Sequence, residues 1–214
     1  MHQGRTALNP ESTLTRNVRV PQPRKILIPL AAIACLVGLG GCFLLQTHPM
    51  DNSQINAYAS ETGKSAASAT SESTELGIER WKSLVGDFSV SNLKGNVASV
   101  YAEQTFFNDT LKTFRDPRAI EDYLIETAEM LKYGRVDYQD TAISGNDVYV
   151  RWKMTYRSKK LAKDDDIVTI GMSHLRFDEA GKVILHQDFW DSTRGVFEHV
   201  PVIGSGIRMI KKRL

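Results

Sequence analysis

Residues 175–191 read LRFDEAGKVILHQDFWD, and this stretch decides the fold. The segment that ends at Phe177 and the segment that begins at Val183 are rich in residues that favour β-strands. A short, mostly polar run that ends in Gly181 separates them. A polar run with a glycine between two such segments is typical of a tight turn that joins antiparallel strands. The stretch therefore predicts a β-hairpin made of strands at 167–177 and 183–190.

The sequence before this hairpin continues the same pattern. Residues 136–142 and 148–156 alternate apolar and polar side chains around a turn at 144–147. Alternation with period two is the mark of half-buried strands. These segments therefore predict an antiparallel meander of four strands.

The period changes to that of a helix upstream of residue 136. Apolar residues recur at helical spacing over 76–85, over 93–101 and after Pro117. We expect the third helix to begin at Pro117, with Asp116 as its cap, and to end at Gly134. Helices followed by an antiparallel meander predict an α+β domain over residues 76–214.

Three blocks of this domain carry a family resemblance: 101–109 (YAEQTFFND), 116–123 (DPRAIEDY) and 175–191. Together they resemble the SnoaL-like branch of the nuclear transport factor 2-like superfamily. The resemblance implies a cone-shaped, strongly bent antiparallel sheet packed on N-terminal helices, an apolar pocket open at one end, and a homodimer. The superfamily holds isomerases, cyclases, hydrolases and proteins that only bind, so the fold does not settle the function.

The last predicted strand places His186 and Asp188 on one face. An imidazole beside a carboxylate in an apolar pocket can accept and return a proton, so these two are the candidate catalytic residues. The alternative is a hydrogen-bonded pair that orders the end of the strand. A metal site formed with His174 is a third alternative; because a satisfied strand histidine is the commoner case, we predict no metal.

Aromatic and polar residues of the domain are the candidate lining of the pocket. We expect ligand contacts from Tyr101, Phe107, Asn108, Tyr123, Trp152, Met154 and Trp190, with Asn108, Asp109 or Tyr123 at the rim. Phosphate-binding loops, nucleophile elbows and dinucleotide fingerprints are absent from the sequence, so no cofactor is predicted. We expect a non-catalytic module that binds a small, mostly apolar ligand or a protein partner. The alternative is a cofactor-independent isomerase or hydrolase that uses the His186/Asp188 pair.

Residues 26–46 predict a transmembrane anchor, because the run from Ile26 to Leu45 has no charge and is long enough to cross a bilayer. Residues 1–25 carry a net charge of +4 and predict a cytoplasmic tail, which places the folded domain outside the cytoplasm, in a bacterial periplasm. Leu39-Gly40-Gly41-Cys42 resembles a lipobox, so a lipoprotein processed at Cys42 is the alternative.

The cysteine count and the distribution of charge exclude some classes of function. Cys35 and Cys42 are the only cysteines, so thiol and disulfide chemistry are excluded from the predicted domain. The net charge of +2 hides two basic ends and a middle, residues 26–204, of −6, so no nucleic-acid partner is expected. Residues 47–75 are rich in serine and threonine and predict a flexible linker. The basic, amphipathic end at 203–214 predicts a helix that packs on its own domain or across a dimer, or that lies on anionic lipid.

Overall fold

The computed structural model describes residues 51–64 and 69–214, and residues 51–214 form one compact unit. Its helices begin with α2 (Ser53–Thr62), α3 (Ser71–Gly86), α4 (Val90–Leu93), α5 (Val97–Val100) and α6 (Pro117–Glu129). After the sheet come α7 (Ser192–Gly195) and α8 (Ile203–Lys211), with the 3-10 turns η1 (Ala162–Asp164) and η2 (Phe197–His199). Within the described residues, no helix is long and apolar enough to span a membrane. The predicted anchor at 26–46 and the basic tail at 1–25 lie outside the described residues.

Six strands form one mixed sheet in the order β2-β1-β6-β5-β4-β3. They are β1 (Tyr101–Asn108), β2 (Thr113–Phe114), β3 (Leu131–Ser144), β4 (Asp147–Ser158), β5 (Ile167–Phe177) and β6 (Val183–Trp190). The predicted meander is confirmed, because β3 to β6 pair antiparallel in chain order.

We expected a wholly antiparallel sheet, and this expectation is wrong in one place. Strand β1 runs parallel to β6. The sequence hides β1: Thr105 to Asn108 are all buried, so no period-two alternation appears. Tyr101 also continues the apolar spacing of the short helix α5, which made it look helical. A strand that is covered on both faces does not alternate, and this one was therefore missed.

Local chemistry sets the ends of α6. The Asp116 side chain accepts a hydrogen bond from the Arg118 amide at 2.9 Å, and Pro117 occupies the first turn, as predicted. The helix ends at Glu129 rather than at Gly134, because Leu131 and Gly134 pair with β4. At Gly134 an added Cβ would lie 3.2 Å from the Cβ of Phe88, so the glycine permits close packing of the strand.

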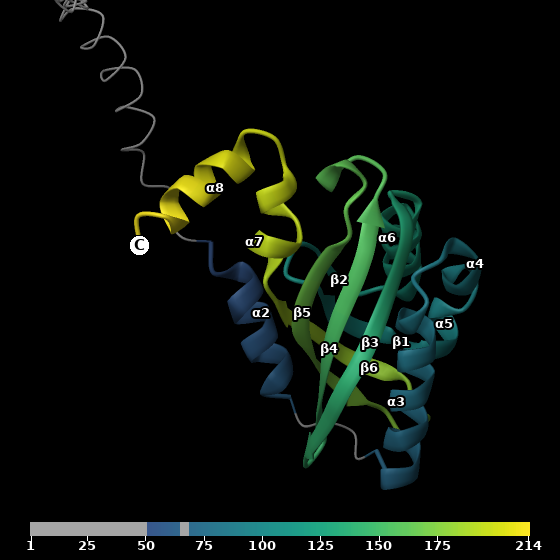
Figure 1. Ribbon diagram of the computed structural model, residues 1–214. Helices are drawn as coiled ribbons and strands as arrows, with labels where there is room; N and C mark the ends of the chain where they lie inside the picture. Colours follow the sequence, from purple (N-terminus) through teal and green to yellow (C-terminus); the bar gives the residue numbers. More distant parts are fainter. Residues whose placement is uncertain (1–50, 65–68) are drawn as a thin grey trace, which may run out of the picture. The chain divides into compact units, whose positions relative to one another are not determined.

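The core lies between α3, α5 and α6 and the inner face of the sheet (Figure 1). Large side chains from both layers fill it, including Trp81, Leu93, Ile120, Val150 and Leu175. The two layers enclose the cavity described below.

The expected flexible linker at 47–75 is wrong where the structure describes it. Helix α2 occupies Ser53–Thr62, and α3 begins at Ser71 with Thr70 as its cap. The Tyr58 hydroxyl lies 2.8 Å from Nδ1 of His174, and Arg115 Nη1 lies 2.6 Å from Glu61 Oε1. These contacts hold α2 on the outer face of the sheet, opposite α3 to α6 (Figure 1).

Candidate functional site

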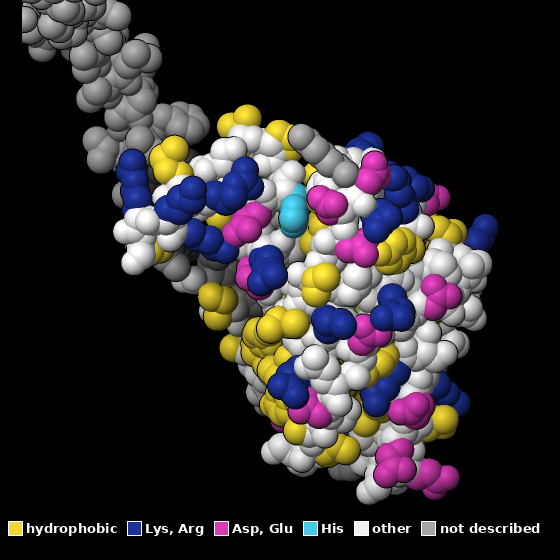
Figure 2. Space-filling model, in the orientation of Figure 1, with side chains coloured by type: hydrophobic (Ala, Val, Ile, Leu, Met, Phe, Trp, Pro, Cys, Tyr) yellow, Lys and Arg dark blue, Asp and Glu magenta, His cyan; other side chains and the backbone are white. Residues whose placement is uncertain are grey.

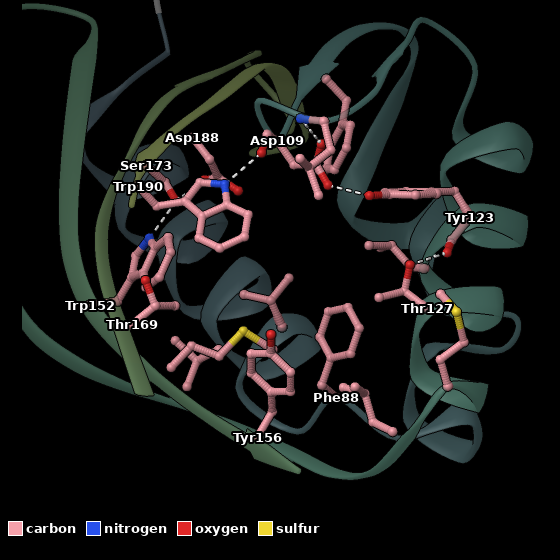
Figure 3. Close-up of a pocket in the computed structure, with 18 of the residues that line it drawn as sticks. Phe88, Asp109, Tyr123, Thr127, Trp152, Tyr156, Thr169, Ser173, Asp188 and Trp190 are labelled. Atoms are coloured by element: carbon pink, nitrogen blue, oxygen red, sulfur yellow. Dashed lines mark hydrogen bonds between the residues drawn. The ribbon is translucent and has the colours of Figure 1, made fainter. Parts of the chain in front are cut away.

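A cavity of about 380 Å³ lies between the inner face of the sheet and the helices (Figure 3). Side chains from α3, α6, β3 and β4 form much of its apolar wall, among them Trp81, Val85, Leu124, Val136 and Met154. Polar side chains gather where β1, β5 and β6 meet. The cavity therefore has an apolar body and one polar end.

Seven of the nine predicted site residues line this cavity: Phe107, Tyr123, Trp152, Met154, His186, Asp188 and Trp190. Tyr101 and Asn108 do not line it. The hydroxyl of Tyr101 lies behind the wall and contacts His186. Asn108 follows the inward-facing Phe107, so its side chain points to the outer face and bonds Thr113 and Gln187 there.

His186 and Asp188 lie on the same face of β6, with 2.8 Å between Nε2 and Oδ1. An ionised carboxylate only accepts hydrogen bonds, so the Nε2–H of His186 donates to Asp188. The Tyr101 hydroxyl lies 2.8 Å from the other ring nitrogen, Nδ1. The two contacts hold the imidazole ring from both sides and orient it toward Asp188.

Asp188 also receives a bond from the neighbouring strand. Ser173 Oγ donates to the same Oδ1 at 2.5 Å and accepts a bond from Trp152 Nε1 at 2.9 Å. Among the described residues, no donor reaches Oδ2 of Asp188. One oxygen of the carboxylate is thus held in place, while the other has hydrogen-bonding capacity left for a ligand.

A second carboxylate, Asp109, lies at the same end of the cavity (Figure 3). The Tyr123 hydroxyl donates to its Oδ2, and the amides of Leu111 and Lys112 donate to its Oδ1 at 2.9 and 2.8 Å. Trp190 Nε1 donates to the Asp109 carbonyl at 2.6 Å, which ties β6 to the end of β1.

The environment favours the neutral form of Asp109. Burial raises the pKa of its carboxyl, and the charge of Asp188 acts in the same direction, against the donors at Tyr123, Lys112 and Leu111. Burial also raises the pKa of Tyr123, so its hydroxyl stays protonated. The polar end therefore offers an acceptor at Asp188 beside a carboxyl group with an elevated pKa.

His174 takes no part in this site. It lies on β5 next to Ser173, so its side chain points to the outer face, where Nε2 lies 2.7 Å from Asp147 Oδ1. The alternative metal site of His174, His186 and Asp188 is therefore not assembled. The part of the chain that the structure describes holds no group of three histidine, cysteine or acidic side chains placed for a metal.

Ser173, which bonds Asp188, is one of the lining residues that sequence reasoning missed. Period two along 167–177 places it on the face of Leu175 and Phe177, which is the inner face. Its position opposite Asp188 depends on the register between β5 and β6, which residue spacing alone does not set.

Several solved structures are similar to part of this chain at low sequence identity. An NTF2-like protein of unknown function from Exiguobacterium sp. 255-15 is 15% identical over 55% of this chain and 99% of its own, with a TM-score of 0.45. An LEH-like epoxide hydrolase from M. tuberculosis is 12% identical over 66% of this chain and 98% of its own, with a TM-score of 0.48. TsrD from Streptomyces laurentii is 10% identical over 61% and 96%, with a TM-score of 0.49.

No curated protein matches the chain. The family model of the SnoaL-like domain matches residues 92–186, which run from α4 to the middle of β6 and include His186. Over residues 92–186 the chain is therefore similar to the SnoaL-like domain.

Proposed function

We propose that the cavity binds a small, mostly apolar molecule that carries one polar group. The apolar wall favours a hydrocarbon body, because burial of apolar surface contributes about 25 cal/mol per Å². The polar group hydrogen-bonds at the end formed by Asp188 and Asp109. The observation that carries the proposal is Asp188, whose Oδ1 is bonded by both Ser173 and His186 while Oδ2 has no donor among the described residues.

The test is a search for the bound molecule and for its dependence on Asp188. The full chain is purified from its own cells in mild detergent, and an organic extract is analysed by mass spectrometry. We expect a small molecule in stoichiometric amount and at least a tenfold loss in Asp188→Asn, which keeps the shape but turns one oxygen into a donor. Asp140→Asn is the matched control, since Asp140 lies on β3 in an exposed ion pair with Arg151. Equal amounts from both variants would refute the role of Asp188.

A second function, proton transfer without a cofactor, is favoured by the same geometry. A carboxylate oriented by His186 and Ser173 in an apolar cavity is suited to take a proton from a carbon next to a carbonyl. In this mechanism the hydrogen bond to the oxygen of that carbonyl comes from the Asp109 carboxyl, whose pKa is raised by burial and which lies at the same end of the cavity. In this mechanism Asp188 is the base and returns the proton to a different carbon of the same molecule.

Deuterium separates binding from proton transfer. The extracted molecule is incubated with the full chain in D₂O, and its mass is followed with time. Proton transfer predicts carbon-bound deuterium that appears with the wild type and with Asp140→Asn but not with Asp188→Asn. Binding of the molecule without any deuterium uptake or conversion would leave the binding function and reject the catalytic one.

We further propose that residues 26–46 anchor the protein in a membrane with the SnoaL-like domain on the extracytoplasmic side. The uncharged run and the basic residues before it support this arrangement. Alkaline carbonate extraction should leave the chain in the membrane, and protease added outside the cytoplasmic membrane should cut the domain. Mass spectrometry of the N-terminus decides between this anchor and a lipoprotein that begins at Cys42. Release by carbonate, or protection of the domain, would contradict the proposal.

A further inference from the structure

Helix α8 has apolar side chains that are exposed on the surface of the domain. Ile203, Ile207 and Ile210 recur at helical spacing and share one face of α8, which we call the α8 stripe. Ile203 is 52% exposed and Ile210 is 61% exposed, whereas Ile207 is partly buried; Leu214, which follows the helix, is fully exposed. An amphipathic helix of a globular domain normally buries this face, so the exposure of the α8 stripe needs an explanation.

The opposite edge of α8 is the one attached to the domain. Gly204 is its only buried residue, and an added Cβ there would lie 2.0 Å from the carbonyl oxygen of Glu198. Arg208 Nη1 donates to the same carbonyl at 2.8 Å, and Lys211 forms an ion pair with the Glu198 carboxylate. Glycine and cations thus hold α8 in place, and the α8 stripe faces outward. The helix at 203–211 therefore does contact its own domain, which is one of the expected alternatives, but it does so through Gly204, Arg208 and Lys211 rather than through the whole α8 stripe.

The charge of this segment points to the nature of its partner. Residues 203–214 contain Arg208, Lys211, Lys212 and Arg213 and no acidic residue. Lys211 is the last residue of α8, and Lys212 and Arg213 follow directly after it. Figure 2 shows the basic side chains gathered over α8. An apolar stripe next to a run of cations matches the boundary between acyl chains and anionic headgroups.

The position of α8 is consistent with such a surface. Figure 1 shows α8 and the first turn of α2 toward the same end of the domain, and the β3–β4 turn at the other end. The described unit begins at Asp51, five residues after the apolar run 26–46. Five residues span at most about 18 Å, so a chain anchored through 26–46 would keep this end of the domain near the bilayer.

We propose that the α8 stripe inserts into the surface of an anionic lipid bilayer, with Lys212 and Arg213 among the headgroup phosphates. Each basic residue near such a surface strengthens binding roughly fivefold at low salt. Binding through α8 would hold the SnoaL-like domain against the membrane.

The test follows α8 itself in the full chain. Cys35 and Cys42 are replaced by serine, and an environment-sensitive fluorophore is attached at Ile210→Cys or, as the control, at Asn146→Cys in the β3–β4 turn. The chain is placed in vesicles of phosphatidylcholine alone or with 30% phosphatidylglycerol, each doped with nitroxide-labelled lipid. The readout is quenching of the fluorophore, which does not depend on whether residues 26–46 span the bilayer.

We expect strong quenching at position 210 only with phosphatidylglycerol, its loss in high salt, and none at position 146. The double variant Lys212→Gln with Arg213→Gln should weaken membrane association of α8 roughly 30-fold. Lys212 and Arg213 are exposed, so we expect their replacement to leave the fold intact. An unquenched probe at position 210 in phosphatidylglycerol vesicles would overturn the proposal. Cross-linking between two chains through Ile210→Cys in place of quenching would also overturn it and would identify a second copy as the partner of the α8 stripe.

Discussion

His186 and Asp188 are two residues apart on β6, and Nε2 of His186 lies 2.8 Å from Oδ1 of Asp188 in the wall of an apolar cavity. The hydroxyl of the buried Tyr101 bonds the other ring nitrogen of His186. The imidazole is thus held on both sides, and the carboxylate is oriented by it. The predictions that follow test this arrangement and its surroundings.

Replacement of His186 by alanine should destabilise the protein. The variant leaves the Tyr101 hydroxyl without its hydrogen-bond partner at a buried position and opens a void among Trp81, Phe107 and Tyr101. We expect the free energy of unfolding to fall by about 3 kcal/mol, measured by urea denaturation of the full chain.

The matched control for this variant is His199→Ala, since His199 makes one exposed hydrogen bond to the Arg194 carbonyl. Its effect should stay within about 0.5 kcal/mol. Equal losses from the two variants would mean that His186 is not the structural centre of the cavity wall.

Gly171 should not tolerate a side chain. An added Cβ would lie 2.4 Å from two carbons of the Trp152 indole and 2.8 Å from the Cβ of Trp190, and both residues line the cavity. We expect Gly171→Ala to cost about 1–3 kcal/mol of stability by overpacking. Gly206→Ala on α8 meets nothing within 4 Å and should leave stability unchanged or raise it by about 0.5–1 kcal/mol. The midpoint of thermal unfolding should therefore fall for Gly171→Ala and should stay the same or rise for Gly206→Ala. An equal shift in both variants would contradict the packing of the two tryptophans around Gly171.

Asp109 should make stability fall as the pH rises. Its folded-state pKa is raised above the ordinary value of 3.8, mainly by burial, so the native state binds more protons than the unfolded chain between 3.8 and that raised pKa. Asp109→Asn removes this titration. The stability of the variant relative to the wild type should therefore increase as pH rises through that interval and then stay constant.

Asp147 should change stability with pH in the opposite direction from Asp109, because its folded-state pKa is lowered rather than raised. Burial acts to raise the pKa of Asp147, but bonds from Arg176 and His174 outweigh it and lower the pKa below 3.8. Its contribution is present above pH 3.8 and is lost as the pH falls through the folded pKa. Asp147→Asn should be less stable than the wild type at pH 7, and the difference should shrink below pH 3.8. Urea denaturation from pH 3 to pH 7 checks both variants. The stability of each variant relative to the wild type is plotted against pH, and slopes of the same sign for Asp109→Asn and Asp147→Asn would contradict the two pKa directions.

Tyr58 should control how firmly α2 is held. Its hydroxyl bonds Nδ1 of the buried His174, and its ring packs edge-on against Phe189 with 5.6 Å between ring centroids. Tyr58→Phe removes only the hydrogen bond, worth about 1 kcal/mol. Amide hydrogen exchange in Ser53–Thr62 should accelerate roughly fivefold. Ile55→Ala on the exposed side of the same helix is the control; acceleration of both to the same extent would show that the bond is not what holds α2.

The parts of the fold that the sequence predicts are those set by short-range patterns. The cap at Asp116, the turn at 178–181 and the shared face of His186 and Asp188 each follow from residues within a few positions of one another. Such local preferences survive folding here because the tertiary contacts agree with them.

The parts that were missed depend on distant partners. Residues 101–108 became a strand because β6, some eighty residues away, pairs with them. Tyr58 folds onto His174, 116 residues away, so the composition of 47–75 gave no sign that α2 would be docked. Spacing identified the apolar face of α8, but it could not say that Gly204 rather than that face would meet the domain.

Occupancy of the cavity is the most direct test of the central claim that it binds a small apolar molecule. Native mass spectrometry compares the full chain, Thr127→Phe and Glu126→Phe, all released from detergent micelles. Thr127 lines the cavity from α6, whereas the neighbouring Glu126 is exposed on the same helix. We predict an extra mass of one small molecule on the wild type and on Glu126→Phe, and its absence from Thr127→Phe, where the phenyl ring fills the space. A wild-type chain without bound mass, or the same bound mass on Thr127→Phe, would contradict the account.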